Sequence, residues 1–110
     1  MFLYPKKYEV IVVGGGPAGL ATSQQLKKNG IEHLVLEKGD VAAAAWRRLY
    51  DSLTLHTAKH LSTLPDMTFS KTTPLFVPKD TFLEYLDDYV SHFKLSIKTS
   101  CEVESLEKEN

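Results

Sequence analysis

Cysteine is nearly absent from this chain, since Cys101 is the only one among 110 residues. A lone cysteine cannot form an internal disulfide or supply the cysteine pairs of a zinc site, so we expect no metal centre. Long apolar runs are also missing, because no stretch approaches the roughly 18 residues of a transmembrane helix. The first predicted strand begins by about Tyr8, which leaves no room for a cleavable signal peptide. These absences favour a soluble protein of a reducing compartment, most simply the cytoplasm, with no membrane partner.

An excess of one charge is lacking as well. The 13 basic and 14 acidic side chains give a net charge of −1. Such a balance offers no electrostatic reason to expect nucleic acid or an anionic membrane as a partner. With 43% hydrophobic residues, a chain of this length can hold one core. We therefore expect one domain over residues 1–110.

Glycine is scarce too, but four of the six glycines fall within residues 14–19. This GxGxxG pattern lies between an apolar strand predicted at 8–13 and a helix predicted at 17–29, as in a dinucleotide-binding βαβ unit. There the first glycine permits a tight turn, the second lets the backbone approach a pyrophosphate, and the third lets the helix pack on the strand. The unpaired N–H groups at the start of the helix attract phosphate. The residues expected at the phosphates are Gly14, Gly16, Pro17, Ala18 and Gly19.

A carboxylate follows at the expected distance. A second strand predicted at 33–37 ends at Glu37, eighteen positions beyond Gly19, close to where a βαβ unit places an acid on the adenosine ribose hydroxyls. We include the next residue, Lys38, among the cofactor-binding candidates. Two alternatives remain open at this point: Glu37 can be a solvated strand-end acid, and the glycines can form a plain βα turn without a ligand.

The rest of the chain predicts fewer regular elements. Residues 39–78 are interpreted as short turns and extended pieces wrapped around a ligand, because structureless loops of such length are otherwise uncommon. An amphipathic helix is predicted at 80–93, capped by Asp80 or Thr81, and alternating residues predict a last strand at 97–103. The order β-α-β, loop, α, β indicates an α/β fold of the Rossmann type, with a parallel sheet and a right-handed crossover.

Further short motifs follow the glycine fingerprint and Glu37. They are Trp46-Arg47, the segment 50–57, Leu64-Pro65, and Pro78 followed by Phe82, Tyr85-Leu86 and Tyr89. Together these residues resemble the N-terminal part of single-component, FAD-dependent and NADPH-using monooxygenases, which include the flavin-containing monooxygenases and the plant-type indole-3-pyruvate monooxygenases. The chain departs from the family where a glycine pair often precedes the tryptophan, since Ala43, Ala44 and Ala45 stand there.

The resemblance implies an FAD-binding function. In similar proteins the loop with Trp46 and Arg47 packs along the adenosine and ribityl side of FAD, the segment with His56 leads toward the flavin ring, and the strand matching Val103 meets the adenine. NADPH would reduce FAD, O2 would add to it, and the resulting peroxyflavin would oxygenate a small substrate. The sequence holds no second GxGxxG, so the NADPH site is expected outside these residues.

Several interpretations therefore stay open. We expect residues 1–110 to be the N-terminal portion of an incomplete FAD-binding domain, inactive alone and prone to self-association through uncovered apolar surface. We assign no catalytic residue. Trp46 can be a core aromatic, Arg47 a solvated cation, and His56 a packing residue rather than a proton donor. The alternative functions are a non-enzymatic FAD- or NAD-binding module and a truncated product without a function of its own.

Overall fold

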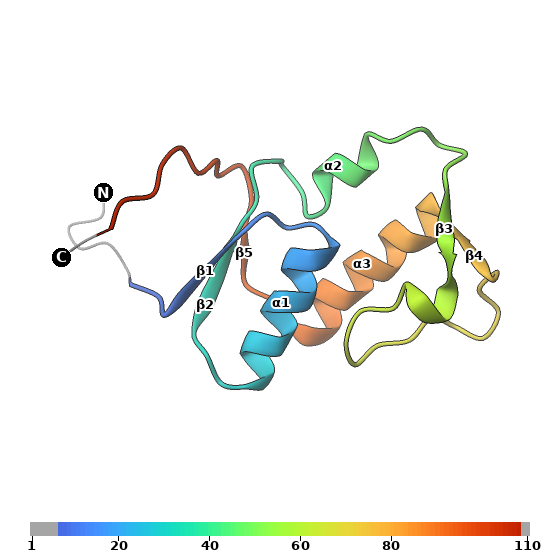
Figure 1. The fold of residues 1–110 in the computed structure, drawn as a ribbon, viewed down its shortest axis with the longest axis horizontal. Helices are drawn as coiled ribbons and strands as arrows, with labels where there is room; N and C mark the ends of the chain where they lie inside the picture. Colours follow the sequence, from blue (N-terminus) through green and yellow to red (C-terminus); the bar gives the residue numbers. More distant parts are fainter. Residues whose placement is uncertain (1–6, 109–110) are drawn as a thin grey trace.

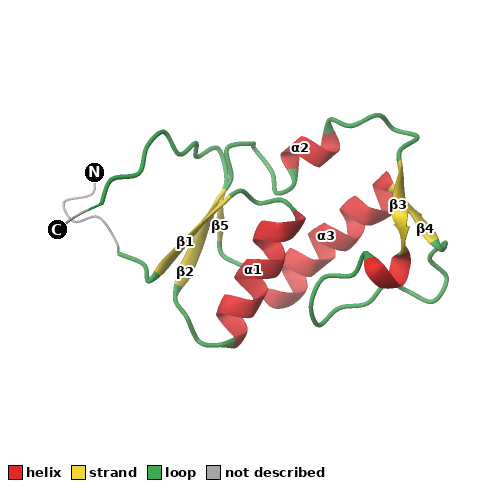
Figure 2. Ribbon diagram, viewed as in Figure 1, coloured by secondary structure: helices red, strands yellow, loops and turns green. Residues whose placement is uncertain are grey.

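The computed structural model describes residues 7–108, which fold into two small sheets and three α-helices (Figures 1 and 2). In chain order the elements are β1 (Val10–Val13), α1 (Pro17–Lys28), β2 (His33–Leu36), α2 (Ala44–Arg47), β3 (Thr54–Ala58), the 3-10 helix η1 (Lys59–Leu61), β4 (Phe76–Pro78), α3 (Lys79–Phe93) and β5 (Ile97–Lys98). The predicted α/β fold with a parallel sheet is confirmed.

The main sheet has the strand order β1-β2-β5, and both strand pairs are parallel. Alternate residues of β2, His33 and Val35, are buried, as the two-residue period of a strand requires when one face is covered. They face α1, where the Ser23 hydroxyl lies 2.6 Å from His33 Nε2. α1 therefore covers one face of the sheet.

The last strand is shorter than the predicted span of 97–103. β5 ends at Lys98, and Ser100 adopts a left-handed backbone conformation with φ of 52°. A non-glycine residue in this region interrupts the extended path. The N–H of Ser100 donates to the Gly39 carbonyl and that of Cys101 to the Glu37 carbonyl, so the chain stays beside the end of β2 without forming a regular strand.

The segment predicted as irregular, residues 39–78, contains real secondary structure. β3 and β4 form an antiparallel pair in which Thr54 lies opposite Pro78 and Ala58 opposite Phe76. This pair lies at the N-terminal end of α3 (Figure 2). Sequence periodicity missed it because each strand is stabilised by a partner distant in the chain rather than by its own pattern.

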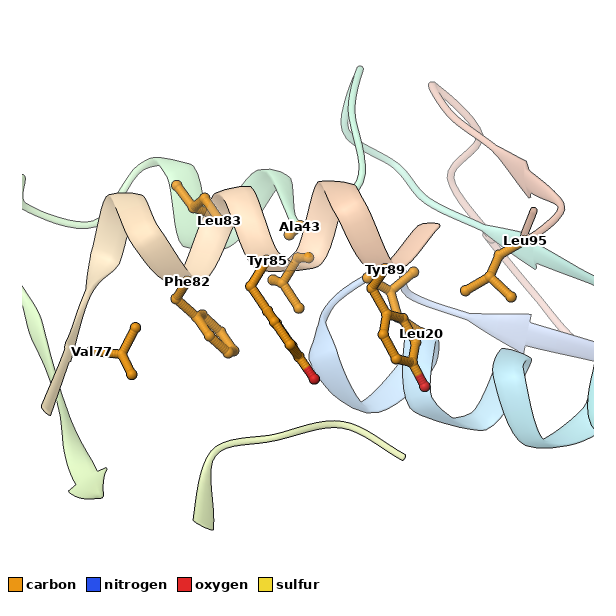
Figure 3. Packing of buried hydrophobic residues seen from close by; sticks show 9 residues of the cluster. Leu20, Ala43, Val77, Phe82, Leu83, Tyr85, Tyr89 and Leu95 are labelled. Carbon is orange, nitrogen blue, oxygen red and sulfur yellow. The ribbon is translucent and has the colours of Figure 1, made fainter. Parts of the chain in front are cut away.

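α3 carries most of the core. The buried cluster joins its inner face to α1 and to the residues before α2 and after α3, as Figure 3 shows for most of these side chains. Its members are Leu20, Ala43, Val77, Phe82, Leu83, Tyr85, Leu86, Tyr89 and Leu95. The predicted caps are wrong: the helix begins at Lys79 after Pro78, with no side-chain cap, so Asp80 and Thr81 lie inside the first turn.

Two tyrosines of α3 hold the loop that precedes β4. The Tyr89 hydroxyl donates to the Pro65 carbonyl at 2.8 Å. The Tyr85 hydroxyl donates to the Met67 carbonyl at 2.5 Å and accepts from the Leu64 N–H at 2.8 Å. Buried tyrosine hydroxyls need such partners. The loop around Leu64-Pro65, part of the family-like sequence, is therefore a structural element packed on α3.

The sheet face opposite α1 exposes apolar side chains: Ile11 is 43% and Val13 58% exposed. No helix within residues 7–108 covers this face (Figure 1). Self-association through it stays a prediction. No helix of the described part of the chain is long and apolar enough to cross a membrane.

Candidate functional site

A cavity of about 420 Å³ opens at the carboxyl ends of β1 and β2. Its wall is formed by Val13, Gly14 and Gly16 of the first turn, by Leu36, Glu37 and Lys38 at the end of β2, by Ala45 and Arg48 in and after α2, and by Cys101, Glu102 and Val103 after β5. Ligands of open parallel sheets bind outside the carboxyl ends of the strands, and pockets for small molecules have volumes of about 300–1,000 Å³. Position and size both fit a nucleotide.

The glycine turn has the backbone geometry that the fingerprint predicts. Gly14 has φ of 102°, a value that residues other than glycine rarely adopt. Its N–H donates to the Leu36 carbonyl at 2.8 Å. A Cβ atom added at Gly16 would meet no protein atom within 4 Å, whereas one added at Gly19 would collide with the Gly14 carbonyl oxygen. Gly19 therefore permits the close contact between helix and strand, and Gly16 leaves open space beside the cavity.

The start of α1 is free to bind an anion. The helix begins at Pro17 after Gly16, and neither a side-chain cap nor an acidic residue occupies its first turn. The first N–H groups of a helix lack partners within the helix and lie at its positive dipole end. Pro17 and Ala18 thus contribute the helix terminus next to the cavity rather than side-chain contacts.

The carboxylate of Glu37 has a structural role in addition to the predicted contact with ribose. Its side chain is buried, with Oε1 accepting a hydrogen bond from the Gly15 N–H at 2.9 Å and Oε2 accepting one from the Gly39 N–H at 2.6 Å. Each carboxylate oxygen has a further lone pair, so ribose hydroxyls can still donate to it. The structural task of Glu37 was not predicted, because both amides belong to loops rather than to a recognisable motif.

The short helix α2 is fixed directly beside the glycine turn. The Ala43 N–H donates to the Gly15 carbonyl at 2.8 Å, and Ala43 adopts a left-handed conformation with φ of 57°. Such a conformation costs a residue with a Cβ roughly 1–2 kcal/mol. A Cβ atom at Gly39 would collide with Ala44. The alanines that replace the family's glycine pair therefore still bring α2 against the turn, with Gly39 providing the space.

The structure brings five of the predicted site residues together in the cavity wall: Gly14, Gly16, Glu37, Lys38 and Val103. Val103 reaches it from the irregular segment after β5, so its predicted place on a strand is wrong. Ser100, with its left-handed backbone, ends the strand before that point.

Three other predicted residues point elsewhere. The Trp46 ring packs on Phe82, with ring centroids 5.1 Å apart, at the edge of the core. The Arg47 guanidinium forms an ion pair with Asp87 at 2.6 Å and donates to the Ala42 carbonyl at 3.1 Å. His56 is exposed on β3. Contacts of these three with a cofactor stay predictions.

Sequence reasoning missed the other six residues of the cavity wall, which are Val13, Leu36, Ala45, Arg48, Cys101 and Glu102. The sequence carried no signal for Arg48, because no pattern in it distinguishes Arg48 from Arg47. The sequence could not show which side of α2 faces the turn.

Comparisons with known proteins agree with this geometry. The sequence profile of the family described as pyridine nucleotide-disulphide oxidoreductase matches residues 11–110. A probable indole-3-pyruvate monooxygenase of Arabidopsis thaliana, YUCCA10, is 43% identical over 97 residues, which cover 87% of this chain and 25% of that protein. The chain thus spans about a quarter of the length of this curated relative.

Two solved structures have a similar fold. Bacillithiol disulfide reductase Bdr from Staphylococcus aureus superposes with a TM-score of 0.89 at 26% identity, over 96% of this chain and 32% of that one. A flavin-containing monooxygenase from Stenotrophomonas maltophilia gives a TM-score of 0.76 at 24% identity, over 83% and 28%. The predicted resemblance to flavin monooxygenases is confirmed, and the family to which the chain is matched is one of oxidoreductases.

Proposed function

Since the chain belongs to the pyridine nucleotide-disulphide oxidoreductase family, we propose that its cavity holds the adenosine diphosphate half of FAD in an NADPH-dependent monooxygenase acting on a small molecule. One observation carries this proposal: the glycine turn, the uncapped start of α1 and the carboxylate of Glu37 meet in a single cavity.

The residues present fit this half of the cofactor. Open space at Gly16 lies where the backbone must approach a pyrophosphate, and the first turn of α1 offers N–H groups to its oxygens. Glu37 lies at the end of β2, where it can accept hydrogen bonds from ribose hydroxyls. Because its charge would repel a ribose 2′-phosphate, the site favours the adenosine of FAD over that of NADP.

Bound FAD would supply the redox and oxygen chemistry, with NADPH as the reductant and O2 as the oxidant. The part of the chain described here would bind and orient the cofactor. Gly14 and Gly16 would admit the pyrophosphate, Glu37 would fix the ribose, and Val103 would contact the adenine. An NADPH site outside these residues and a cytoplasmic location stay predictions.

The test is calorimetric titration of the 110-residue chain with FAD, with ADP and with ADP carrying a ribose 2′-phosphate. We expect saturable 1:1 binding of FAD and ADP with affinities within about tenfold of each other, because the cavity contacts only the half that they share. The 2′-phosphate should weaken binding by about tenfold or more through repulsion by Glu37. Failure of both FAD and ADP to bind would contradict the proposal, and preference for the 2′-phosphate would identify an NADP site instead.

A second candidate function is reduction of a small disulfide. It is favoured by the TM-score of 0.89 with bacillithiol disulfide reductase, whereas the 43% identity to a probable indole-3-pyruvate monooxygenase favours oxygenation. The two functions differ in their oxidant. With FAD and NADPH both bound, a monooxygenase would consume O2. A disulfide reductase would instead release thiols from an added disulfide.

A further inference from the structure

We propose that Arg48, rather than its neighbour Arg47, is the side chain that binds the pyrophosphate of the dinucleotide. This inference rests on the proposed function, because it concerns a residue of the same cavity. It assigns a charge-specific role to a position that the sequence motif did not single out.

The position of α2 places Arg48 on the phosphate side of the cavity. The Ala43 N–H bonds to the Gly15 carbonyl, and the Arg48 N–H bonds to the Ala45 carbonyl at 3.3 Å. Arg48 therefore lies one turn after a helix start that is attached to the glycine turn. Both Ala45 and Arg48 line the cavity together with Gly14 and Gly16.

The guanidinium of Arg48 is available to a ligand. Its side chain is exposed, and within residues 7–108 it takes part in no side-chain hydrogen bond or ion pair. The guanidinium of Arg47 is instead engaged by Asp87 and by the Ala42 carbonyl. Moving Arg47 toward the cavity would require breaking both contacts, while Arg48 needs only to close on its ligand.

The backbone around Arg48 is held by the buried side chain of Lys79. Lys79, only 2% exposed, donates from Nζ to the Leu49 carbonyl at 2.6 Å and to the Arg47 carbonyl at 3.5 Å, and it pairs with Asp51 at 3.2 Å. The carbonyl groups of both neighbours of Arg48, Arg47 and Leu49, are thus attached to the first residue of α3. This attachment restrains the backbone conformation from which the Arg48 side chain extends.

The charges of the cavity are divided in a way that suits a nucleotide. Glu37 and Lys38 come from the end of β2, on the side expected for the ribose, and Glu102 comes from the segment after β5. The cations of the cavity wall are Lys38 and Arg48, and Arg48 is the one that comes from the end of α2, whose start is attached to the glycine turn. A guanidinium presents paired N–H donors that match phosphate oxygens, and it would add a full charge to the partial charge of the α1 terminus.

The experiment is titration with ADP of the wild type, Arg48→Gln, Arg48→Lys, Arg47→Gln and a charge-matched control, Lys71→Gln, whose side chain is exposed in the loop before β4. Each titration is made at 0.05 M and at 0.5 M salt. We expect Arg48→Gln to weaken ADP binding about tenfold at low salt, Arg48→Lys to recover part of this loss, and the other two variants to stay within twofold of the wild type. Thermal unfolding of each variant checks that the fold is unchanged.

Salt separates a charge contact from a disturbed structure. The loss of ADP affinity in Arg48→Gln, relative to the wild type, should be smaller at 0.5 M salt. Screening weakens the contact between Arg48 and the phosphates, which the wild type has and Arg48→Gln lacks. A deficit equal at both salt concentrations, or an Arg48→Gln affinity within twofold of the wild type, would overturn the assignment. A larger loss in Arg47→Gln would return the role to that residue. If the wild type itself binds no ADP, the proposed function fails, and this inference fails with it.

Discussion

The carboxylate of Glu37 accepts a hydrogen bond from the backbone N–H of Gly15 at 2.9 Å. This contact joins the end of β2 to the glycine turn after β1, across 22 positions of the sequence. The acid expected to bind ribose is therefore also the group that holds the glycine turn in place. Under the proposed function, cofactor binding and local stability depend on the same side chain.

We predict that Glu37→Ala lowers both the stability of the fold and its affinity for FAD. The variant leaves the buried amide of Gly15 and the partly buried amide of Gly39 without acceptors, which should reduce the free energy of unfolding by about 2 kcal/mol or more. Loss of the ribose contact should weaken FAD binding by about 10- to 100-fold. Urea unfolding and calorimetry measure the two effects. Glu102→Gln, an exposed cavity residue, is the control, and equal unfolding free energies in the two variants would refute the structural role.

Gly16 and Gly19 should respond in opposite ways to an added side chain. Gly16→Val should fold with nearly wild-type stability, because its backbone is extended, with φ of −82° and ψ of −173°, and its Cβ meets open space, but it should lose FAD and ADP binding. Gly19→Ala should be destabilised by about 1–3 kcal/mol, because its Cβ collides with the Gly14 carbonyl. Circular dichroism, thermal unfolding and ADP titration distinguish them. Native ADP affinity in a folded Gly16→Val protein would contradict the phosphate role of the turn.

Cys101 offers a chemical probe of the cavity. Cys101 is partly exposed and lines the cavity, and the chain has no other cysteine. We predict that ADP at ten times its Kd slows alkylation of Cys101 by iodoacetamide about tenfold, since only the unliganded fraction reacts. Mass spectrometry follows the reaction. The Gly16→Val variant is the control, because ADP should give it no protection, and undiminished alkylation of the wild type would place the ligand elsewhere.

Alkaline pH should weaken the packing of α3. Burial raises the pKa of the Tyr89 phenol and of the Tyr85 phenol above the ordinary value of about 10. Because the folded state holds these protons more tightly than the unfolded state, the stabilisation is complete below about pH 10 and is lost progressively as the pH rises above it. The free energy of unfolding, measured in urea between pH 8 and 11, should therefore fall above pH 10.

Two variants separate this effect from general alkaline damage. Tyr89→Phe should lose about 1 kcal/mol at neutral pH, because the Pro65 carbonyl loses its donor, and its alkaline decline should be shallower. Tyr50→Phe removes a phenol that is 64% exposed and should leave the decline unchanged. A decline of the same steepness in all three proteins would show that Tyr89 is not its cause.

The local sequence determined the first half of the fold. The βαβ unit from Val10 to Leu36 was predicted within a few residues, because its strands and helix have the periodicity of elements with one covered face. The positive φ of Gly14 and Gly30, at 102° and 71°, is permitted by their residue type at the ends of predicted elements. Glycine is the residue that adopts such angles without a steric cost.

Only the tertiary structure decided which side chains reach the cavity. Arg47 and Arg48 are equivalent to any sequence pattern, yet the first meets Asp87 and the second lines the cavity, because Lys79 and the Gly15 carbonyl fix the orientation of α2. Val103 reaches the cavity because the strand ends before Ser100, which has a left-handed backbone conformation. β3 forms because it pairs with β4. Local patterns report backbone conformation and burial, whereas side-chain direction depends on contacts between segments far apart in the chain.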